Sequence, residues 1–244
     1  MSCPVYGLQC TAEAPLTSLQ NLASFYIQKI TDHYPMGAVH LGGYSFGACV
    51  AFEMALQLQQ AQRTIGHLVL LDGSPLDTGA IAGRYWGRAR RYGVAYEVEF
   101  LSSVLCSFMM LFMTVDFIKV HGELLAADSQ ESRVAYATEV LLQTGLFHEW
   151  SGLEEAAWSY YKKLIIADRY QVDDHYHGNI TLIRTEHGHE WSEGRGEDYG
   201  LHKVCDGVVT VHRVAGDHMT FMEGDRVVAT ASAILGHPAP TEAC

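Results

Sequence analysis

Gly43-Tyr44-Ser45-Phe46-Gly47 lies between an apolar run, Ala38-Val39-His40-Leu41, and a segment with helical spacing, residues 48–54. A G-x-S-x-G pattern between a strand and a helix is typical of a nucleophile elbow. Such a turn is sharp enough to expose the serine hydroxyl at the end of a sheet, and we expect small residues to be required on both sides of it. The segment therefore predicts that Ser45 is a nucleophile.

Two further residues follow Ser45 in the order that this elbow requires. Asp72 closes the next apolar run, residues 68–71, and His218 comes after a later one, residues 208–212. Serine, acid and histidine in this chain order form the catalytic triad of α/β-hydrolases. The order predicts a hydrolase with Ser45 as nucleophile, Asp72 as acid and His218 as base.

A second carboxylate competes with Asp72 for the position of the acid. Many hydrolases place the acid on a later strand, and Glu186 follows the apolar segment Leu182-Ile183-Arg184-Thr185 in that position. Asp217 stands beside the histidine, and we interpret it as a turn former. The pattern of residues by itself leaves Asp72 and Glu186 open.

The composition excludes several classes of protein. The 244 residues suit one α/β domain with an insertion, or two small domains, and 48% of them are hydrophobic. The net charge of −12 argues against a nucleic-acid binder, which would present a basic patch. The six cysteines form no C-x-x-C pair and no signal peptide is evident, so we expect a reduced, cytoplasmic protein.

Two histidine-rich segments resemble metal sites at first inspection. They are Asp173-Asp174-His175-Tyr176-His177 and His187-Gly188-His189-Glu190. Neither has the i, i+4 helical spacing of H-E-x-x-H, and neither has cysteine companions. We therefore expect solvated loops there, no metal site, and no cofactor.

One long apolar segment bears on membranes and on substrate. Phe100 to Val115 is sixteen residues without a charge, bounded by Glu99 and Asp116. A spanning helix needs about 20 apolar residues, so we expect a buried helix that lines an apolar cavity, and no membrane span. Met and Phe are suited to a pocket for a flexible chain. The candidate pocket residues are Phe100, Leu101, Leu105, Met109, Phe112 and Met113.

Strand and helix patterns alternate at both ends of the chain but not in its middle. Such alternation predicts a parallel sheet with helices on both faces, here residues 1–80 and 170–244, interrupted by a helical insertion over residues 81–169. The expected strands are 5–9, 38–44, 65–72, 179–184 and 208–214, and the expected helices are 16–33, 46–62, 81–94, 96–126, 129–144, 151–169 and 225–235.

Six segments together resemble one known family. They are Tyr6-Gly7-Leu8-Gln9-Cys10-Thr11, residues 43–54, Asp72-Gly73-Ser74-Pro75, Tyr176-His177-Gly178-Asn179, Val204-Cys205-Asp206-Gly207 and Gly216-Asp217-His218. The chain resembles the thioesterase domain of animal fatty acid synthase, and related animal polyketide synthases carry similar domains. The resemblance extends over nearly the whole chain and is weakest over residues 79–150.

The resemblance implies a function and a set of roles. In that family the three motif residues that match Ser45, Asp72 and His218 are nucleophile, acid and base, which favours Asp72 over Glu186. The helical insertion forms an acyl groove there. The implied activity is release of a long-chain fatty acid from the phosphopantetheine arm of an acyl carrier protein in the same polypeptide. Polyketide release, editing, and non-catalytic acyl binding by a remnant of a synthase are the alternatives.

The oxyanion hole departs from the pattern of the family. Its first donor is the backbone N–H of Phe46, and a second comes from a loop after an earlier strand of the fold. The chain starts at the strand expected around Tyr6, so we expect the N-terminal strands of the fold to be missing. Losing one oxyanion donor costs about 10²–10³ in rate. The chain is therefore expected to be an N-terminally incomplete piece of a larger synthase, the interpretation that we favour, or a shortened variant with impaired activity.

Overall fold

The computed structural model describes residues 5–76, 87–147, 150–187 and 196–235. The chain divides into two compact units. The units meet after residues 78 and 168, within two residues of the boundaries after residues 80 and 169 that the sequence predicts. The first unit comprises Met1–Thr78 and Arg169–Cys244, and the second comprises Gly79–Asp168.

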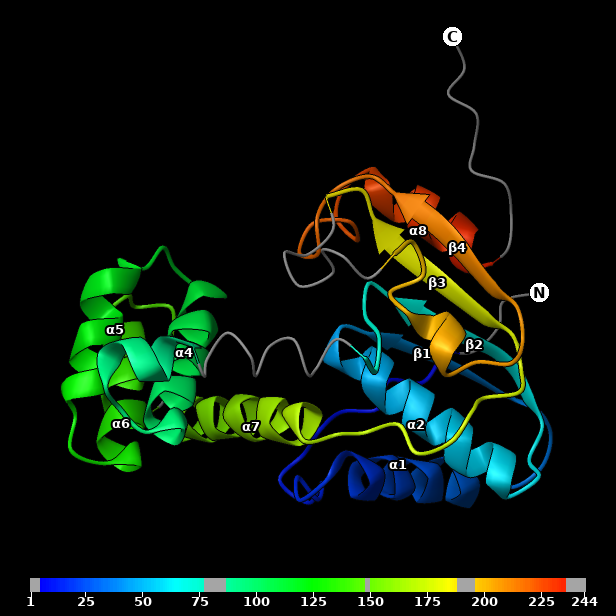
Figure 1. The fold of residues 1–244 in the computed structure, drawn as a ribbon, viewed down its shortest axis with the longest axis horizontal. Helices are drawn as coiled ribbons and strands as arrows, with labels where there is room; N and C mark the ends of the chain where they lie inside the picture. The colour runs from blue at the N-terminus through cyan, green and yellow to red at the C-terminus, as the bar shows by residue number, and fades with distance from the viewer. Residues whose placement is uncertain (1–4, 77–86, 148–149, 188–195, 236–244) are drawn as a thin grey trace, which may run out of the picture. The chain divides into compact units, whose positions relative to one another are not determined.

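The first unit is built on a four-stranded sheet whose strands all run parallel in the order β1-β2-β3-β4. Helix α2 packs on β1 and β2 with α1 beside it, and α8 packs on β3 and β4 from the other face (Figure 1). The predicted α/β class is confirmed. The elements are α1 (Leu19–His33), β1 (Val39–Tyr44), α2 (Phe46–Gln60), β2 (Ile65–Leu71), β3 (Ile180–Thr185), β4 (Val209–Val214) and α8 (Arg226–Ile234).

Burial explains why these segments form a covered sheet. Leu68, Val69 and Leu70 of β2 are successive and all buried, as expected for a strand with helices on both faces. Helix α2 is buried from Ala48 to Leu56, and its Phe52 is fully inaccessible. Because all four strands are parallel, their carboxyl ends meet at one edge, where residues 44–45, 72, 185 and the loop after β4 come together.

The strand expected at residues 5–9 is wrong. The segment has no strand conformation, and Val5 and Tyr6 are 92% and 82% exposed. A strand needs a neighbour that accepts and donates its backbone hydrogen bonds. In the described part of the chain β1 is the outer strand of the sheet and pairs with β2, and residues 5–9 pair with neither.

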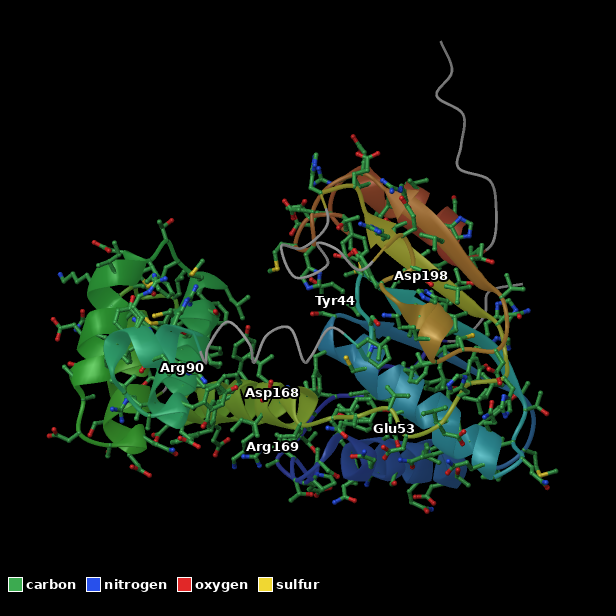
Figure 2. All side chains as sticks on the ribbon, in the orientation of Figure 1. Tyr44, Glu53, Arg90, Asp168, Arg169 and Asp198 are labelled. Carbon is green, nitrogen blue, oxygen red and sulfur yellow. The ribbon has the colours of Figure 1, made fainter. Side chains whose placement is uncertain are left out.

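The second unit is helical, as its sequence pattern predicts. Its core contains Leu101, Leu105, Leu124 and Leu141, all fully buried. Residues 87–92 are helical, whereas 81–86 of the same expected helix lie outside the described residues. The main helices are α4 (Tyr96–Met110), α5 (Phe117–Ala126), α6 (Gln130–Leu142) and α7 (Trp150–Asp168). α7 ends at Asp168, the last residue of the second unit, and the next residue, Arg169, belongs to the first unit (Figure 2).

One helix expected over residues 96–126 is two helices. α4 ends at Met110, and α5 starts after Asp116, whose side chain accepts a hydrogen bond from the Lys119 amide at 3.2 Å. This contact is an N-cap, which stabilises a helix start and competes with helix continuation. The helical pattern continues on both sides of Asp116 and does not show that this residue caps a new helix.

The candidate pocket residues fall into two groups. Phe100, Leu101, Leu105 and Met109 lie on α4 and are at most 2% exposed within the core of the helical unit. Phe112 lies beyond the end of α4 and is 40% exposed. The expectation of a single buried helix through Val115 is therefore wrong. Met113 packs partly buried against the core.

No helix in the described ranges combines the length and apolarity needed to cross a bilayer.

A polar cluster lies inside this apolar core. Glu99 is fully buried and its carboxylate lies 3.1 Å from Nε2 of His121, which is 3% exposed. Ser103 donates to Glu99 at 2.9 Å and lies 3.4 Å from the same histidine nitrogen. Phe117 stacks on the His121 ring with centroids 5.0 Å apart. Burying a carboxylate is unfavourable unless it is paired and hydrogen-bonded, so these contacts make Glu99 compatible with the core.

We predict that His121→Phe destabilises the helical unit by about 3 kcal/mol, because the ring stacking is kept while Glu99 loses its cationic or hydrogen-bonding partner. The double substitution Glu99→Leu with His121→Phe should recover most of that loss, since no buried carboxylate is then left unpaired. Urea unfolding followed by circular dichroism measures both. A double variant no more stable than the single one would contradict the pairing.

Candidate active site

The elbow is a direct strand-to-helix turn centred on Ser45. β1 ends at Tyr44 and α2 starts at Phe46, and Ser45 between them has φ 55° and ψ −118°. This left-handed backbone is unfavourable for a residue with a side chain and persists only where the surroundings fix it. Here the Ser45 amide donates to the Leu71 carbonyl at 3.0 Å, and the Ser45 carbonyl accepts from Ala48 at 3.0 Å. Both backbone groups thus hold the turn.

Two glycines allow this turn to pack closely. A Cβ atom at Gly43 would lie 1.9 Å from the Gly47 carbonyl oxygen, and one at Gly73 would lie 2.7 Å from the Ser45 carbonyl oxygen. By contrast, a Cβ atom at Gly47 would meet no atom within 4 Å among the surroundings that the structure describes. The expectation that small residues are required on both sides of Ser45 therefore holds at Gly43 and is wrong at Gly47.

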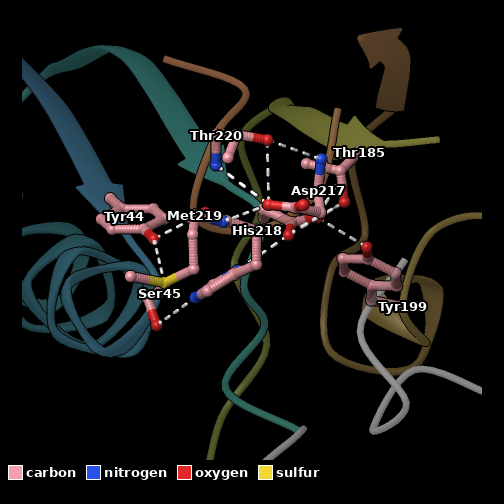
Figure 3. A network of polar contacts seen from close by, with 9 residues as sticks. Tyr44, Ser45, Thr185, Tyr199, Asp217, His218, Met219 and Thr220 are labelled. Atoms are coloured by element: carbon pink, nitrogen blue, oxygen red, sulfur yellow. Dashed lines mark hydrogen bonds and ion pairs between the residues drawn. The ribbon is translucent and has the colours of Figure 1, made fainter. Parts of the chain in front are cut away.

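The structure brings Ser45, Asp72 and His218 together. Figure 3 shows Ser45 beside the His218 ring. The Ser45 Oγ lies 2.9 Å from His218 Nε2, and His218 Nδ1 lies 2.8 Å from Asp72 Oδ2. An ionised carboxylate only accepts hydrogen bonds, so Nδ1 carries the proton and Nε2 is left to accept from the serine hydroxyl. The arrangement can take a proton from Ser45 as the oxygen attacks an electrophile.

Asp72 is held by more than His218. Its carboxylate is buried and also accepts from the Tyr199 hydroxyl at 2.7 Å and from the Thr185 amide at 3.1 Å. Burial by itself raises the pKa of Asp72, but the hydrogen bonds from His218, Tyr199 and Thr185 outweigh it and lower the pKa below its ordinary value. The carboxylate therefore stays ionised in a buried place.

Glu186 is exposed at the end of β3, and in the described structure it is Asp72 that contacts His218. Both strand ends reach the same edge, but the Asp72 amide donates to the Ile183 carbonyl at 2.7 Å, which aligns Asp72 with Thr185 rather than with Glu186. Of the two carboxylates that the residue pattern left open, Asp72 is therefore the one that the described structure places against His218.

Asp217 forms the turn that presents the histidine, as its sequence predicts. Its carboxylate accepts from the Met219 amide at 2.9 Å and from the amide and hydroxyl of Thr220 at 3.0 and 2.9 Å. The hydrogen bond from the Thr220 side chain is the largest of the effects that lower the pKa of Asp217. The side chain is committed to the loop that carries His218.

Three residues at the site were missed by the sequence reading. Tyr44 donates from its hydroxyl to the His218 carbonyl at 2.7 Å, and the two rings lie 4.9 Å apart. Thr185 could have been found, because it ends the strand adjacent to the one that delivers Asp72. Tyr199 lies in a loop far along the chain, and no local pattern identifies it.

Phe46 occupies the place expected for an oxyanion donor. It is the first residue of α2, so its amide belongs to the helix turn whose N–H groups have no acceptor within the helix. A helix N-terminus also carries partial positive charge, which favours an oxyanion. The position of Phe46 is compatible with stabilising negative charge beside Ser45.

In the histidine-rich segment of residues 173–177, two histidines contact a carboxylate. His175 and His177 each direct Nδ1 to the Asp206 carboxylate, at 2.8 and 2.7 Å. Across the described residues no group of three or more His, Cys, Asp or Glu side chains is arranged to hold a metal ion. Residues 188–190 of the other segment lie outside the described ranges. In the described part of the chain, Cys10, Cys49, Cys106 and Cys205 form no disulfide.

Residues 2–237 match the thioesterase domain family. The chain belongs to this family. Membership implies hydrolysis of thioesters, a reaction that the strand–turn–helix elbow and its serine are suited to perform.

Curated relatives are much longer proteins. This thioesterase chain is 26% identical to the chondramide synthase of Chondromyces crocatus over 222 residues, which are 90% of the chain but 6% of that protein. It is 40% identical to the indigoidine synthase of Streptomyces lavendulae over 100 residues, 41% of the chain and 8% of that protein. The chain thus spans a small fraction of the length of these relatives.

Solved structures show the same fold. A four-domain nonribosomal peptide synthetase bound to AMP and glycine aligns with a TM-score of 0.65 and 20% identity, over 94% of this chain and 17% of that one. The NocB thioesterase domain, in covalent complex with a fluorophosphonate nocardicin G analogue, aligns with a TM-score of 0.51 and 20% identity, over 92% of this chain and 76% of that one. At these identities the likeness establishes the fold class.

We predict that Gly43→Ala and Gly47→Ala differ sharply in stability. Gly43→Ala forces a Cβ atom against the Gly47 carbonyl and should cost about 3 kcal/mol or prevent folding. Gly47→Ala lies in the first turn of α2 with open space around it and should be neutral or stabilise by about 0.5 kcal/mol. Urea unfolding measures both, and equal losses would show that the elbow does not depend on close packing at Gly43.

Proposed function

We propose that this thioesterase releases an acyl group from a carrier through a covalent intermediate on Ser45. The single observation that carries the proposal is the continuous hydrogen-bond path from Ser45 Oγ through His218 to Asp72 at the strand–helix turn. Serine hydroxyls are weak nucleophiles unless an adjacent base accepts the proton, and this path supplies that base.

In the proposed first half-reaction, Ser45 Oγ attacks the thioester carbonyl and its proton moves to His218 Nε2. The negative charge of the tetrahedral intermediate faces the Phe46 amide at the start of α2. The C–S bond then breaks, the sulfur takes the proton from Nε2, and the acyl group remains as an ester on Ser45. In the second half, His218 Nε2 takes a proton from water as the water oxygen attacks the ester carbonyl. The bond from the acyl carbon to Ser45 Oγ then breaks, Nε2 returns the proton to Oγ, and the free acid leaves.

Asp72 acts on this cycle through charge. The imidazolium that forms on His218 during attack lies 2.8 Å from a buried carboxylate, where the low dielectric strengthens their attraction. Asp72 also fixes the tautomer that leaves Nε2 unprotonated before attack. The hydrogen bonds to Asp72 keep it charged for both tasks.

The proposed substrate is an acyl chain on the phosphopantetheine arm of a carrier protein in the same polypeptide. The curated relatives that support this are multidomain synthases, of which the matched region is a small part. A tether makes capture of the substrate intramolecular, at millimolar effective concentration, so a chain of charge −12 needs no electrostatic steering.

Two product classes remain as candidates, each with its own support. The resemblance of the motifs around Ser45 and Asp72 to animal fatty acid synthase favours a long-chain fatty acid. Similarity to PksR, a polyketide synthase of Bacillus subtilis, at 37% identity over 73 residues favours a polyketide acid. Similarity to the dimodular nonribosomal peptide synthase of the same organism, at 40% identity over 77 residues, favours a peptidyl acid. Non-catalytic binding of acyl groups is disfavoured by the assembled path from Ser45 to Asp72.

We predict that the chain hydrolyses acyl-pantetheine thioesters and that Ser45→Ala reduces the rate to background. Asp72→Asn should lower kcat by about 10⁴, because the amide stabilises the wrong tautomer of His218. Glu186→Gln is the matched carboxylate control and should retain the wild-type rate.

Hydrolysis that survives in Ser45→Ala, or that is lost in Glu186→Gln and retained in Asp72→Asn, would refute the proposed roles. Labelling by a fluorophosphonate separates catalysis from binding, because the reagent requires an activated serine. Comparing acyl chains from short to long, and fatty with β-keto or peptidyl groups, then separates the candidate products.

A further inference from the structure

Tyr199 combines burial, backbone strain and a hydrogen bond to Asp72. Its side chain is 2% exposed, and its φ of 52° lies in the left-handed region that bulky residues rarely adopt. Its hydroxyl donates to Asp72 Oδ1 at 2.7 Å. Ser45 and Asp72, with φ of 55° and 46°, share this backbone conformation. Strained residues of this kind persist where surrounding contacts fix them, and three of them meet at this site.

The loop that carries Tyr199 is anchored to the strands that carry the site. The Tyr199 carbonyl accepts from the Ser74 hydroxyl at 3.2 Å, and Ser74 is fully buried two residues beyond Asp72. The Arg184 guanidinium lies 4.8 Å from the centre of the Tyr199 ring and also donates to the Gly196 carbonyl at 2.8 Å. Backbone and ring are therefore held independently, and the hydroxyl has a defined position.

The two oxygens of Asp72 have different partners. Oδ2 faces His218 Nδ1, whereas Oδ1 accepts from the Tyr199 hydroxyl and the Thr185 amide. The Thr185 hydroxyl lies 3.2 and 3.1 Å from the two oxygens and does not distinguish them. Rotation of the carboxylate about its Cβ–Cγ bond would take Oδ2 away from His218 and break the bond to Tyr199 at the same time.

We propose that Tyr199 is a positioning residue, which acts through Asp72 by fixing the carboxylate so that Oδ2 is aligned with His218. The assignment rests on the proposed function, because it matters for catalysis when His218 is the base. Tyr199 contacts Asp72 through its hydroxyl, at the carboxylate oxygen that does not face His218 Nδ1. The hydroxyl donates in a buried place where the carboxylate would otherwise lose a partner.

A second buried tyrosine offers a matched control. The Tyr170 hydroxyl donates to Glu53 Oε2 at 2.5 Å, and Tyr170 is 6% exposed. Glu53 lies on α2 of the same unit (Figure 2), eight positions along the chain from Ser45. Replacing either tyrosine by phenylalanine removes one hydroxyl from one buried carboxylate, but Tyr199→Phe affects the carboxylate that contacts His218.

The test compares Tyr199→Phe and Tyr170→Phe in the full chain. Tyr199→Phe should lower kcat for acyl-pantetheine hydrolysis about tenfold with KM unchanged. The hydrogen bond from Tyr199 is one of the effects that lower the pKa of Asp72, so its loss raises that pKa, and the loss of activity that accompanies protonation of Asp72 should begin at higher pH. Tyr170→Phe should leave kcat and the profile as in the wild type, even if it lowers the melting temperature.

Wild-type kcat and pH profile in Tyr199→Phe would overturn the assignment, as would equal effects of the two substitutions. A measurement that does not depend on turnover distinguishes failure of the Tyr199 assignment from failure of the proposed function. The proton on His218 Nδ1 gives a low-field NMR resonance that should shift in Tyr199→Phe and not in Tyr170→Phe. If the wild type hydrolyses no thioester, the proposed function fails, while the resonance still decides whether Tyr199 positions Asp72.

Discussion

The hydrogen bond between Asp72 and His218 is the contact on which the candidate site depends. It joins residues 146 positions apart, and it forms because β2, β3 and β4 are parallel neighbours whose carboxyl ends meet at one edge. The same edge receives the elbow from β1. Any change that disturbs the register between these strands moves the carboxylate away from the imidazole. The chemistry proposed for the site therefore depends on the register of the sheet.

Strong short-range constraints made the elbow and its partners predictable. A serine in a sharp turn between strand and helix, with acid and histidine after later apolar runs, is a pattern that few local structures produce. The choice between Asp72 and Glu186 was not local, since it depends on how β2 and β3 align, and the residue pattern left it open until the resemblance favoured Asp72. Tyr199 was missed for the same reason, because its loop reaches Asp72 from far along the chain.

Two structural predictions were wrong because a sequence pattern does not show which strands pair or which side chains are buried. Residues 5–9 have the apolar character of a strand but no partner among the described residues. The uncharged run after Phe100 suggested one helix, yet Asp116 caps a new one and Phe112 is exposed between them. In the opposite sense, Glu99 was taken as the polar boundary of that run and is fully buried with His121. Whether the helical unit selects the acyl group stays a prediction.

The most direct test of the account is to detect the covalent intermediate on Ser45. The chain is mixed with an acyl-pantetheine thioester, quenched in acid within the first turnover and digested, and the peptides are analysed by mass spectrometry. The account predicts an acyl ester on the peptide that contains Ser45, absent when Ser45 is replaced by alanine. Hydrolysis without this adduct, or an acyl group found instead on the neighbouring Cys49, would contradict it.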